Sequence, residues 1–172
     1  PIYLKTDTHW TPQAMTEVSK FVYEMTKSLI EDAGYTKQVL KTKRQSLSNK
    51  GDLSIRLTGS YAEKIFPPES TTITQILNET NEPIQRDKES PILLLGDSFT
   101  NIYSMESMNW GRSAGLFEQL SFHYSHPIDK IAQNGSSASG SRKILVKDIL
   151  NGGTRLKNKK VVIWQFGQRE LL

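Results

Sequence analysis

The chain has 172 residues, the length of a single domain with one sizeable core, and we expect one domain over residues 1–172. Its 36% hydrophobic and 23% charged residues exclude a disordered chain, and its longest apolar run, residues 92–95, is far shorter than the roughly 18 residues of a membrane-spanning helix. The absence of cysteine excludes disulfides and thiolate sites, and the net charge of +4, with clusters at 41–44 and 157–160 that are typical of loops, does not indicate a nucleic-acid partner.

The N-terminal residues are predicted to form a short strand over residues 2–4, a loop and then a helix. Thr11 and Pro12 suit the N-cap and the first helical position, and Gly34 is expected to end the helix. Apolar residues recur at spacings of three and four, which predicts one stripe that faces a core. The stripe comprises Ala14, Val18, Phe21, Val22, Met25, Leu29 and Ile30. The chain begins abruptly, so we expect a truncated domain that lacks upstream strands.

Residues 38–85 give a weaker signal. Residues 71–77 alternate and are rich in β-branched side chains, which predicts a strand, whereas residues 51–57 fit a strand or a helix equally well. Pro67 and Pro68 mark a break between them. We expect residues 38–85 to form an excursion from the main fold that covers the functional site.

The remaining residues alternate between strand and helix patterns. The strands are expected over 90–99, 127–131 and 159–166, all buried, and the helices over 114–124 and 141–150. Ile144, Leu145, Ile149 and Leu150 of the last helix should point inward. This order predicts an α/β fold with a parallel sheet between helices, a three-layer α/β/α sandwich.

Two short motifs carry candidate chemistry. Gly96-Asp97-Ser98 follows the clearest strand, and ligands of open parallel sheets bind at the carboxyl ends of strands. On its own this tripeptide is also typical of a plain turn in which Ser98 caps the next element. In Asp7-Thr8-His9, the two outer side chains project to the same side of an extended segment, so the carboxylate can orient an imidazole that activates a serine. The same spacing occurs in metal sites, but no third acidic or histidine cluster is evident, so we expect no metal.

Three segments together resemble a known family, the SGNH-hydrolase-like domain of the alginate O-acetyltransferases. They are residues 3–12, residues 93–100, and residues 161–166 with Arg169-Glu170-Leu171. The resemblance runs over nearly the whole chain, including residues 51–53 and 110–115. In ordinary SGNH hydrolases the aspartate and histidine follow the serine and lie three apart; here they precede it and lie two apart, as in this acetyltransferase group.

The resemblance implies a flavodoxin-like fold and an enzyme without a cofactor. It would move an acetyl group through a serine acyl-enzyme onto hydroxyls of a cell-envelope exopolysaccharide such as alginate. The alternatives are an esterase or deacetylase with the same three residues, and a carbohydrate-binding domain without activity. The resemblance also implies a periplasmic or cell-envelope location, a polysaccharide acceptor and a membrane-bound partner that supplies the acetyl group.

Individual roles follow from the same resemblance. Ser98 is expected to be the nucleophile, His9 the general base and Asp7 the residue that orients His9. The Ser98 backbone N–H is one candidate donor to the oxyanion that forms on the attacked carbonyl. The turn at Asn134 and Gly135 stands where related hydrolases place a second such donor, although a flexible loop fits it nearly as well.

The remaining site candidates either depart from the family pattern or have two alternative roles. Gln165 lies where the wider superfamily has a Gly-x-Asn donor and is a candidate third oxyanion donor. Tyr103 and Trp110 either line a sugar-binding groove or pack in the core. Arg169 either meets a uronate carboxylate or pairs with Glu170.

Overall fold

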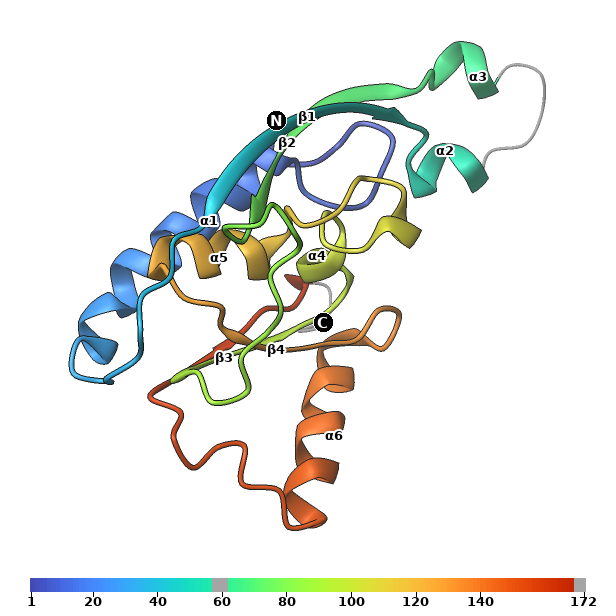
Figure 1. The fold of residues 1–172 in the computed structure, drawn as a ribbon. Coiled ribbons are helices and arrows are strands. Elements are labelled where there is room, and N and C mark those ends of the chain that lie inside the picture. Colours follow the sequence, from blue (N-terminus) through green and yellow to red (C-terminus); the bar gives the residue numbers. More distant parts are fainter. Residues whose placement is uncertain (57–61, 169–172) are drawn as a thin grey trace.

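The computed structural model describes residues 1–56 and 62–168, which form helices and strands joined by loops (Figure 1). In chain order they are α1 (Pro12–Thr26), the 3₁₀ helix η1 (Lys27–Ile30), β1 (Lys41–Asn49), α2 (Asp52–Arg56), α3 (Ala62–Ile65), β2 (Glu69–Leu77), β3 (Ile92–Gly96), α4 (Ser98–Asn101), the 3₁₀ helix η2 (Glu106–Met108), α5 (Leu116–Tyr124), β4 (Asp129–Ala132), α6 (Ser137–Leu150) and β5 (Val161–Trp164).

A parallel sheet of three strands lies at the centre, in the order β4-β3-β5. All five residues of β3 are buried, and successive side chains alternate between the two faces of the sheet. Leu94 belongs to the core cluster that contains Phe117 of α5, whereas Leu93 packs in a second cluster with Leu145 of α6. Helices therefore cover both faces of the sheet, and the predicted three-layer α/β arrangement is confirmed.

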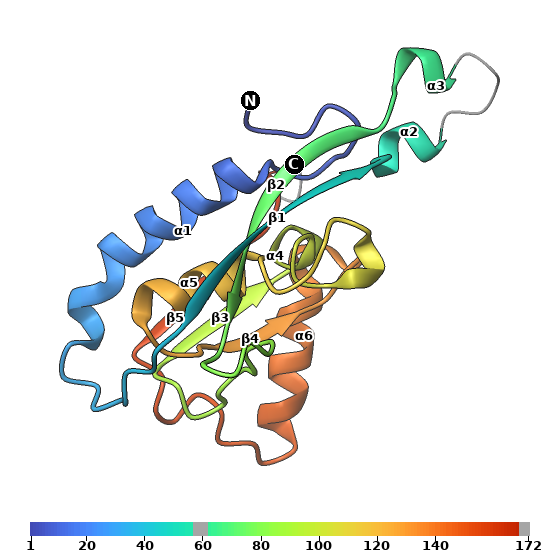
Figure 2. The ribbon, with the colours of Figure 1, turned by 45° about the horizontal axis from the view of Figure 1, so that its top comes forward.

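A long antiparallel hairpin, β1 with β2, lies over α1 and α5 and carries α2 and α3 at its far end (Figure 2). The strand expected at residues 71–77 is confirmed as part of β2. The sequence did not reveal β1, because its nine residues are mostly polar and exposed and lack a buried face. Within residues 51–57 the chain is helical as α2, and Leu57 lies outside the described residues.

At α1 the N-terminal signals are confirmed: Thr11 is the N-cap and its side chain accepts a hydrogen bond from the Ala14 amide. The inward stripe is largely wrong. Phe21, Met25 and Leu29 are each 60% exposed or more, because the helix turns a different face, with Met15 and Ser19 buried, toward the core. The strand expected at residues 2–4 is reduced to an isolated bridge between Tyr3 and Trp10.

Fewer apolar side chains of α6 and β5 are buried than their sequences predicted. Of the four residues expected to point inward from α6, only Leu145 is buried, and Leu150 is 80% exposed. Val162 and Trp164 of β5 are also exposed, since β5 lies at the edge of the sheet that the described residues form. The prediction of a buried third strand is therefore wrong for these two positions.

None of the helices in the described part of the chain is long and apolar enough to cross a membrane.

Candidate active site

Ser98 lies at the carboxyl end of the central strand, as the first residue of α4. Asp97 caps this helix, since its carboxylate accepts a hydrogen bond of 2.8 Å from the Phe99 amide. Gly96 allows the tight turn, because a Cβ at that position would stand 2.0 Å from Oγ1 of the buried Thr100. The turn thus holds the Ser98 hydroxyl at a partly exposed position above the end of the strand.

His9 reaches Ser98 from the opposite end of the sequence. Its Nδ1 lies 2.6 Å from Asp7 Oδ1, and its Nε2 lies 2.9 Å from Ser98 Oγ. A carboxylate only accepts, so Nδ1 carries the proton and the neutral ring offers Nε2 as an acceptor to the Ser98 hydroxyl. The structure therefore brings the three residues together in the order that activates a serine.

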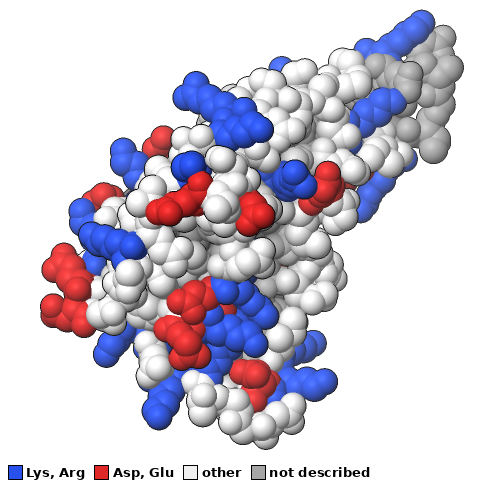
Figure 3. Space-filling view, in the orientation of Figure 1, with Lys and Arg blue, Asp and Glu red and all other residues white. Residues whose placement is uncertain are grey.

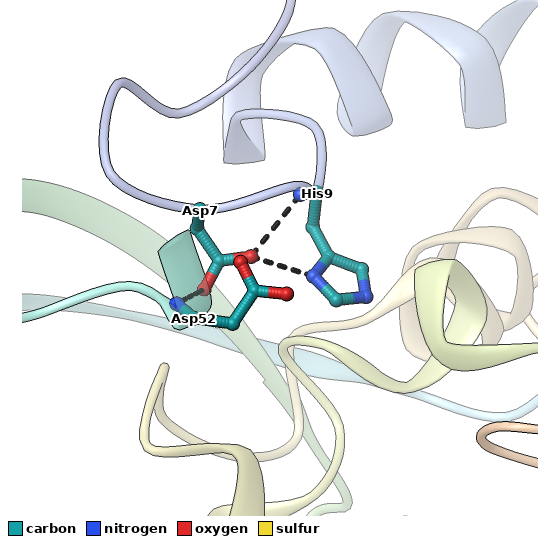
Figure 4. Close-up of side chains that lie close together, drawn as sticks. All are labelled: Asp7, His9 and Asp52. Atoms are coloured by element: carbon teal, nitrogen blue, oxygen red, sulfur yellow. Dashed lines mark hydrogen bonds and ion pairs between the residues drawn. The ribbon is translucent and has the colours of Figure 1, made fainter. Parts of the chain in front are cut away.

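The loop that carries Asp7 and His9 is closed upon itself. The Leu4 amide donates to the His9 carbonyl at 3.0 Å, and the Thr11 amide donates to the Ile2 carbonyl at 2.8 Å. Asp7 and His9 expose only 4% and 6% of their surface, so their pairing takes place away from bulk water. Figure 4 shows both side chains extending from this loop, with the Asp7 carboxylate against the imidazole.

Four donors converge on the Asp7 carboxylate. Oδ1 accepts from the His9 ring and from the His9 amide at 3.1 Å, while Oδ2 accepts from Trp110 Nε1 at 2.8 Å and from the Asp52 amide at 3.0 Å. Burial raises the pKa of Asp7, but the hydrogen bonds from His9, Trp110 and Asp52 outweigh it and lower the pKa from 3.8 to about 2. Asp7 is therefore ionised over the whole physiological range.

This lowered pKa predicts a pH dependence of stability. A carboxylate with a lower pKa in the folded than in the unfolded chain contributes stability above pH 4 that is lost as the pH falls toward 2. For Asp7 the contribution is about 2 kcal/mol. Urea unfolding between pH 2 and 5 should show the stability difference between the wild type and Asp7→Asn shrinking by about this amount. An unchanged difference would contradict the assignment.

Aromatic rings pack around the imidazole. The Phe99 ring lies 4.8 Å from the His9 ring, and Trp10 meets Phe99 edge-on and donates from Nε1 to its carbonyl. Tyr103 donates to the Trp10 carbonyl at 2.6 Å. Tyr103 and Trp110 are completely buried, so neither lines a sugar-binding groove in this structure, and the alternative of core packing describes both.

Two of the predicted oxyanion candidates, Asn134 and Gln165, form hydrogen bonds with residues close to Ser98 in the sequence. Asn101, in the same helix as Ser98, donates to the Asn134 side-chain oxygen at 2.8 Å and so orients that amide. Gly135 follows with φ +68° and is exposed. The side-chain oxygen of Gln165 accepts a hydrogen bond of 2.9 Å from Thr100 Oγ1. This bond stabilises the turn that carries Ser98. Arg169 lies outside the described residues.

Two acidic residues that the sequence analysis missed hold the loop of Asp7 and His9. Asp52 binds Thr8, and Glu69 binds the amides of Lys5 and Thr6. Asp52 lies in the segment 51–53 that the family resemblance includes, but the sequence does not assign it this role, because the contacts of Asp52 and Glu69 join residues 44 to 64 positions apart.

The expectation that no third metal-ligating residue lies near Asp7 and His9 is wrong. Asp52 offers a carboxylate, and the three candidate ligand atoms lie within 4.8 Å of one another (Figure 4). Both Asp52 oxygens accept hydrogen bonds from Thr8, however, and both Asp7 oxygens accept from nitrogen donors. We therefore assign Asp7, His9 and Asp52 to a hydrogen-bonded cluster and not to a metal site.

The chain is similar to known proteins over nearly its whole length. Residues 1–168 match the family described as the SGNH hydrolase-like domain of acetyltransferase AlgX. The probable alginate O-acetylase AlgJ of Pseudomonas fluorescens is 25% identical over 179 residues, which cover 99% of this chain and 41% of that protein.

Two solved structures share the fold. The O-acetyltransferase domain of Pseudomonas putida AlgJ superposes with a TM-score of 0.71 at 21% identity, over 99% of this chain and 54% of that one. Pseudomonas aeruginosa AlgX gives a TM-score of 0.63 at 20% identity, over 96% and 37%. The chain thus spans about half or less of the length of these relatives. Since the family match extends from residue 1 to residue 168, the chain belongs to the family of the SGNH hydrolase-like domain of acetyltransferase AlgX.

Proposed function

We propose that this chain is the catalytic part of an O-acetyltransferase that moves an acetyl group, through an acyl-enzyme at Ser98, onto hydroxyls of an acidic exopolysaccharide such as alginate. The observation that carries the proposal is the continuous hydrogen-bonded chain from Asp7 through His9 to Ser98, with distances of 2.6 and 2.9 Å. Membership of the acetyltransferase family supports acetyl as the group transferred.

In the first half-reaction, Ser98 Oγ attacks the acetyl carbonyl of the donor while His9 Nε2 takes the hydroxyl proton. The tetrahedral intermediate collapses, the donor's leaving group accepts that proton from His9, and Ser98 keeps the acetyl group. In the second half, a sugar hydroxyl gives its proton to His9 and attacks the acetyl-serine. Ser98 then recovers the proton from His9 as the acetylated sugar leaves. Asp7 stays ionised throughout and stabilises the imidazolium.

The negative charge that develops on the carbonyl oxygen needs donors that are already in place, each worth about 3 kcal/mol of the barrier. We assign this role first to the Ser98 backbone N–H, at the start of α4. The Asn134 amide, oriented by Asn101, and the adjoining Gly135 form the second candidate donor group.

Surface charge supports an acidic acceptor. Figure 3 shows Lys and Arg side chains along the upper edge of the molecule, where the hairpin β1–β2 lies, with fewer acidic side chains there. Lys41, Lys43 and Arg44 of β1 are all exposed. The name of the AlgJ relative supports alginate, a polyuronate, as the acceptor. A membrane-bound acetyl donor and a periplasmic or cell-envelope location complete the proposal.

Intact-protein mass spectrometry with an activated acetyl ester tests the proposal. We expect the mass increase of one acetyl group, mapped to Ser98, and its transfer to oligouronate when that acceptor is added. Ser98→Ala should lose both steps, whereas replacement of the exposed Ser28 with alanine should lose neither. Absence of acetyl at Ser98 would overturn the enzymatic assignment. Hydrolysis without transfer to any glycan would show an esterase instead.

A further inference from the structure

The loop of residues 5–8, which carries Asp7, has no regular secondary structure of its own and is held by Asp52 of α2 and Glu69 of β2. Asp52 Oδ1 accepts from the Thr8 amide and Asp52 Oδ2 from the Thr8 hydroxyl, both at 2.8 Å. Glu69 Oε2 accepts from the amides of Lys5 and Thr6, at 2.8 and 3.2 Å. Two carboxylates thus bind backbone amides on both sides of Asp7.

Backbone groups at the start of α2 complete the attachment. The amides of Leu53 and Ser54 donate to the Thr6 carbonyl, and the Asp52 amide donates to Asp7 Oδ2. Gly51 packs so closely that a Cβ there would stand 2.2 Å from the Thr6 carbonyl oxygen. The position of Asp7 is therefore defined largely by residues far from it in sequence.

We propose that Asp52 is a positioning residue of the active site, which fixes Thr8 between Asp7 and His9 and thereby sets the geometry of the Asp7–His9 pair. This inference rests on the proposed function. The inference follows from the two donors of Thr8, its amide and its hydroxyl, because Asp52 accepts a hydrogen bond from each of them. Without that acceptor the loop is no longer held in place, and Asp7 and His9 can shift. A misplacement of about 1 Å at a reacting group costs about 100-fold in rate.

Asp52 also brings a negative charge close to the site, since its carboxylate lies beside that of Asp7 in Figure 4. Two substitutions separate this charge from the hydrogen bonds. Asn keeps an oxygen for the Thr8 amide, and its NH₂ group can donate to the Thr8 hydroxyl, which also accepts. Asp52→Asn therefore removes the charge and keeps the attachment, whereas Asp52→Ala removes both.

The test measures the rate at which a serine-directed fluorophosphonate modifies Ser98. If Asp52 acts by position, Asp52→Ala lowers this rate about 10- to 100-fold, and Asp52→Asn stays within about threefold of the wild type. Thr8→Val should give an intermediate loss, because it removes only the hydroxyl bond, and Thr8→Ser should restore the rate. Ser70→Ala, an exposed position on β2, is the matched control and should change nothing.

Proton NMR gives a readout that a purely structural role would not move. The short bond from His9 Nδ1 to Asp7 should produce a low-field proton signal that disappears in Asp7→Asn. We expect it to shift or broaden in Asp52→Ala and to persist in Asp52→Asn. If Asp52→Ala does not fold, the Thr8 variants carry the same comparison.

The possible failures are distinguishable. If fluorophosphonate does not label Ser98 in the wild type, the proposed function fails, while the NMR signal still tests the role of Asp52. If the wild type is labelled and Asp52→Ala and Thr8→Val react at the wild-type rate with an unchanged signal, the positioning role is overturned. An equal loss in Asp52→Asn and Asp52→Ala would also overturn it, in favour of an effect of charge.

Discussion

We expect Asp7→Asn to lower the rate of acetyl transfer through Ser98 by about 10⁴-fold, the size of effect known for the equivalent change in serine proteases. The reason lies in the donors around the side chain. The four hydrogen bonds to the Asp7 carboxylate all come from nitrogen donors: the His9 ring and amide at Oδ1, and Trp110 and the Asp52 amide at Oδ2. An amide NH₂ at either oxygen position would face N–H groups that now donate to that oxygen.

Each orientation of the asparagine fails in its own way. With the NH₂ group at the Oδ1 position, His9 must turn Nδ1 into an acceptor, so its proton moves to Nε2 and faces Ser98. The ring then cannot take the serine proton. With the NH₂ group at the Oδ2 position, it opposes the N–H groups of Trp110 and Asp52, and buried donors left unpaired cost about 1–3 kcal/mol.

The measurement is the single-turnover rate of Ser98 acetylation, with thermal unfolding to confirm that the variant is folded. The same Asp→Asn change at the exposed Asp32 is the control and should leave the rate unchanged. A folded Asp7→Asn variant that retains more than about a tenth of the wild-type rate would contradict the role of Asp7 as orienting anion.

The sequence predicted the residues of this site because their signals are local. Gly96-Asp97-Ser98 directly follows a buried apolar strand, and Asp7 and His9 lie two residues apart. That His9 meets Ser98 across 89 positions was an expectation that depended on the family resemblance. The roles of Asp52 and Glu69 could not be predicted in this way, since they depend on where α2 and β2 place these residues in the fold.

Burial was predicted less well than secondary structure, and α1 shows why. Periodic apolar residues establish that a helix is amphipathic, but α1 has apolar side chains on more than one side, and spacing does not say which side meets α5. The same limit applies to α6 and β5. An apolar run predicted the strand, whereas its place at the edge of the sheet depends on strand order, which no single strand encodes.

A second large effect is expected far from the chemistry, at Asp129. Asp129→Ala should destabilise the fold by about 3–5 kcal/mol, because it leaves two nearly buried cations without their carboxylate. Asp129, at the start of β4, is completely buried. It accepts two hydrogen bonds from Arg155, at 2.5 and 2.7 Å, and lies 3.3 Å from Lys159 Nζ.

This cluster joins the start of β4 to the approach to β5, two strands that pair with β3 but not with each other. Lys159 also donates to the carbonyls of Lys88 and Ser90, so its ammonium connects the segment before β3 to the Asp129 carboxylate at the start of β4. The hydrogen bond and the charge of Asp129 raise the pKa of Arg155, which shows that the pair is stabilised in its ionised form. Without the carboxylate, nothing offsets the free energy needed to remove the two cations from water, and the folded state is destabilised.

The loss of stability is measured by equilibrium urea unfolding of Asp129→Ala. The double variant Asp129→Ala/Arg155→Ala is measured in the same way. The double variant should regain part of the loss, since it no longer buries an unpaired guanidinium. Asp129 stands at the start of β4, opposite Leu93, whereas Ser98 follows the far end of β3, so the rate per folded molecule should stay at the wild-type value. A loss below about 1 kcal/mol would contradict the assignment. Asp7 and Asp129 are both buried carboxylates surrounded by donors, but only Asp7 lies where a proton must be moved. Asp7→Asn should therefore lower both the rate per folded molecule and the stability, whereas Asp129→Ala should lower the stability alone.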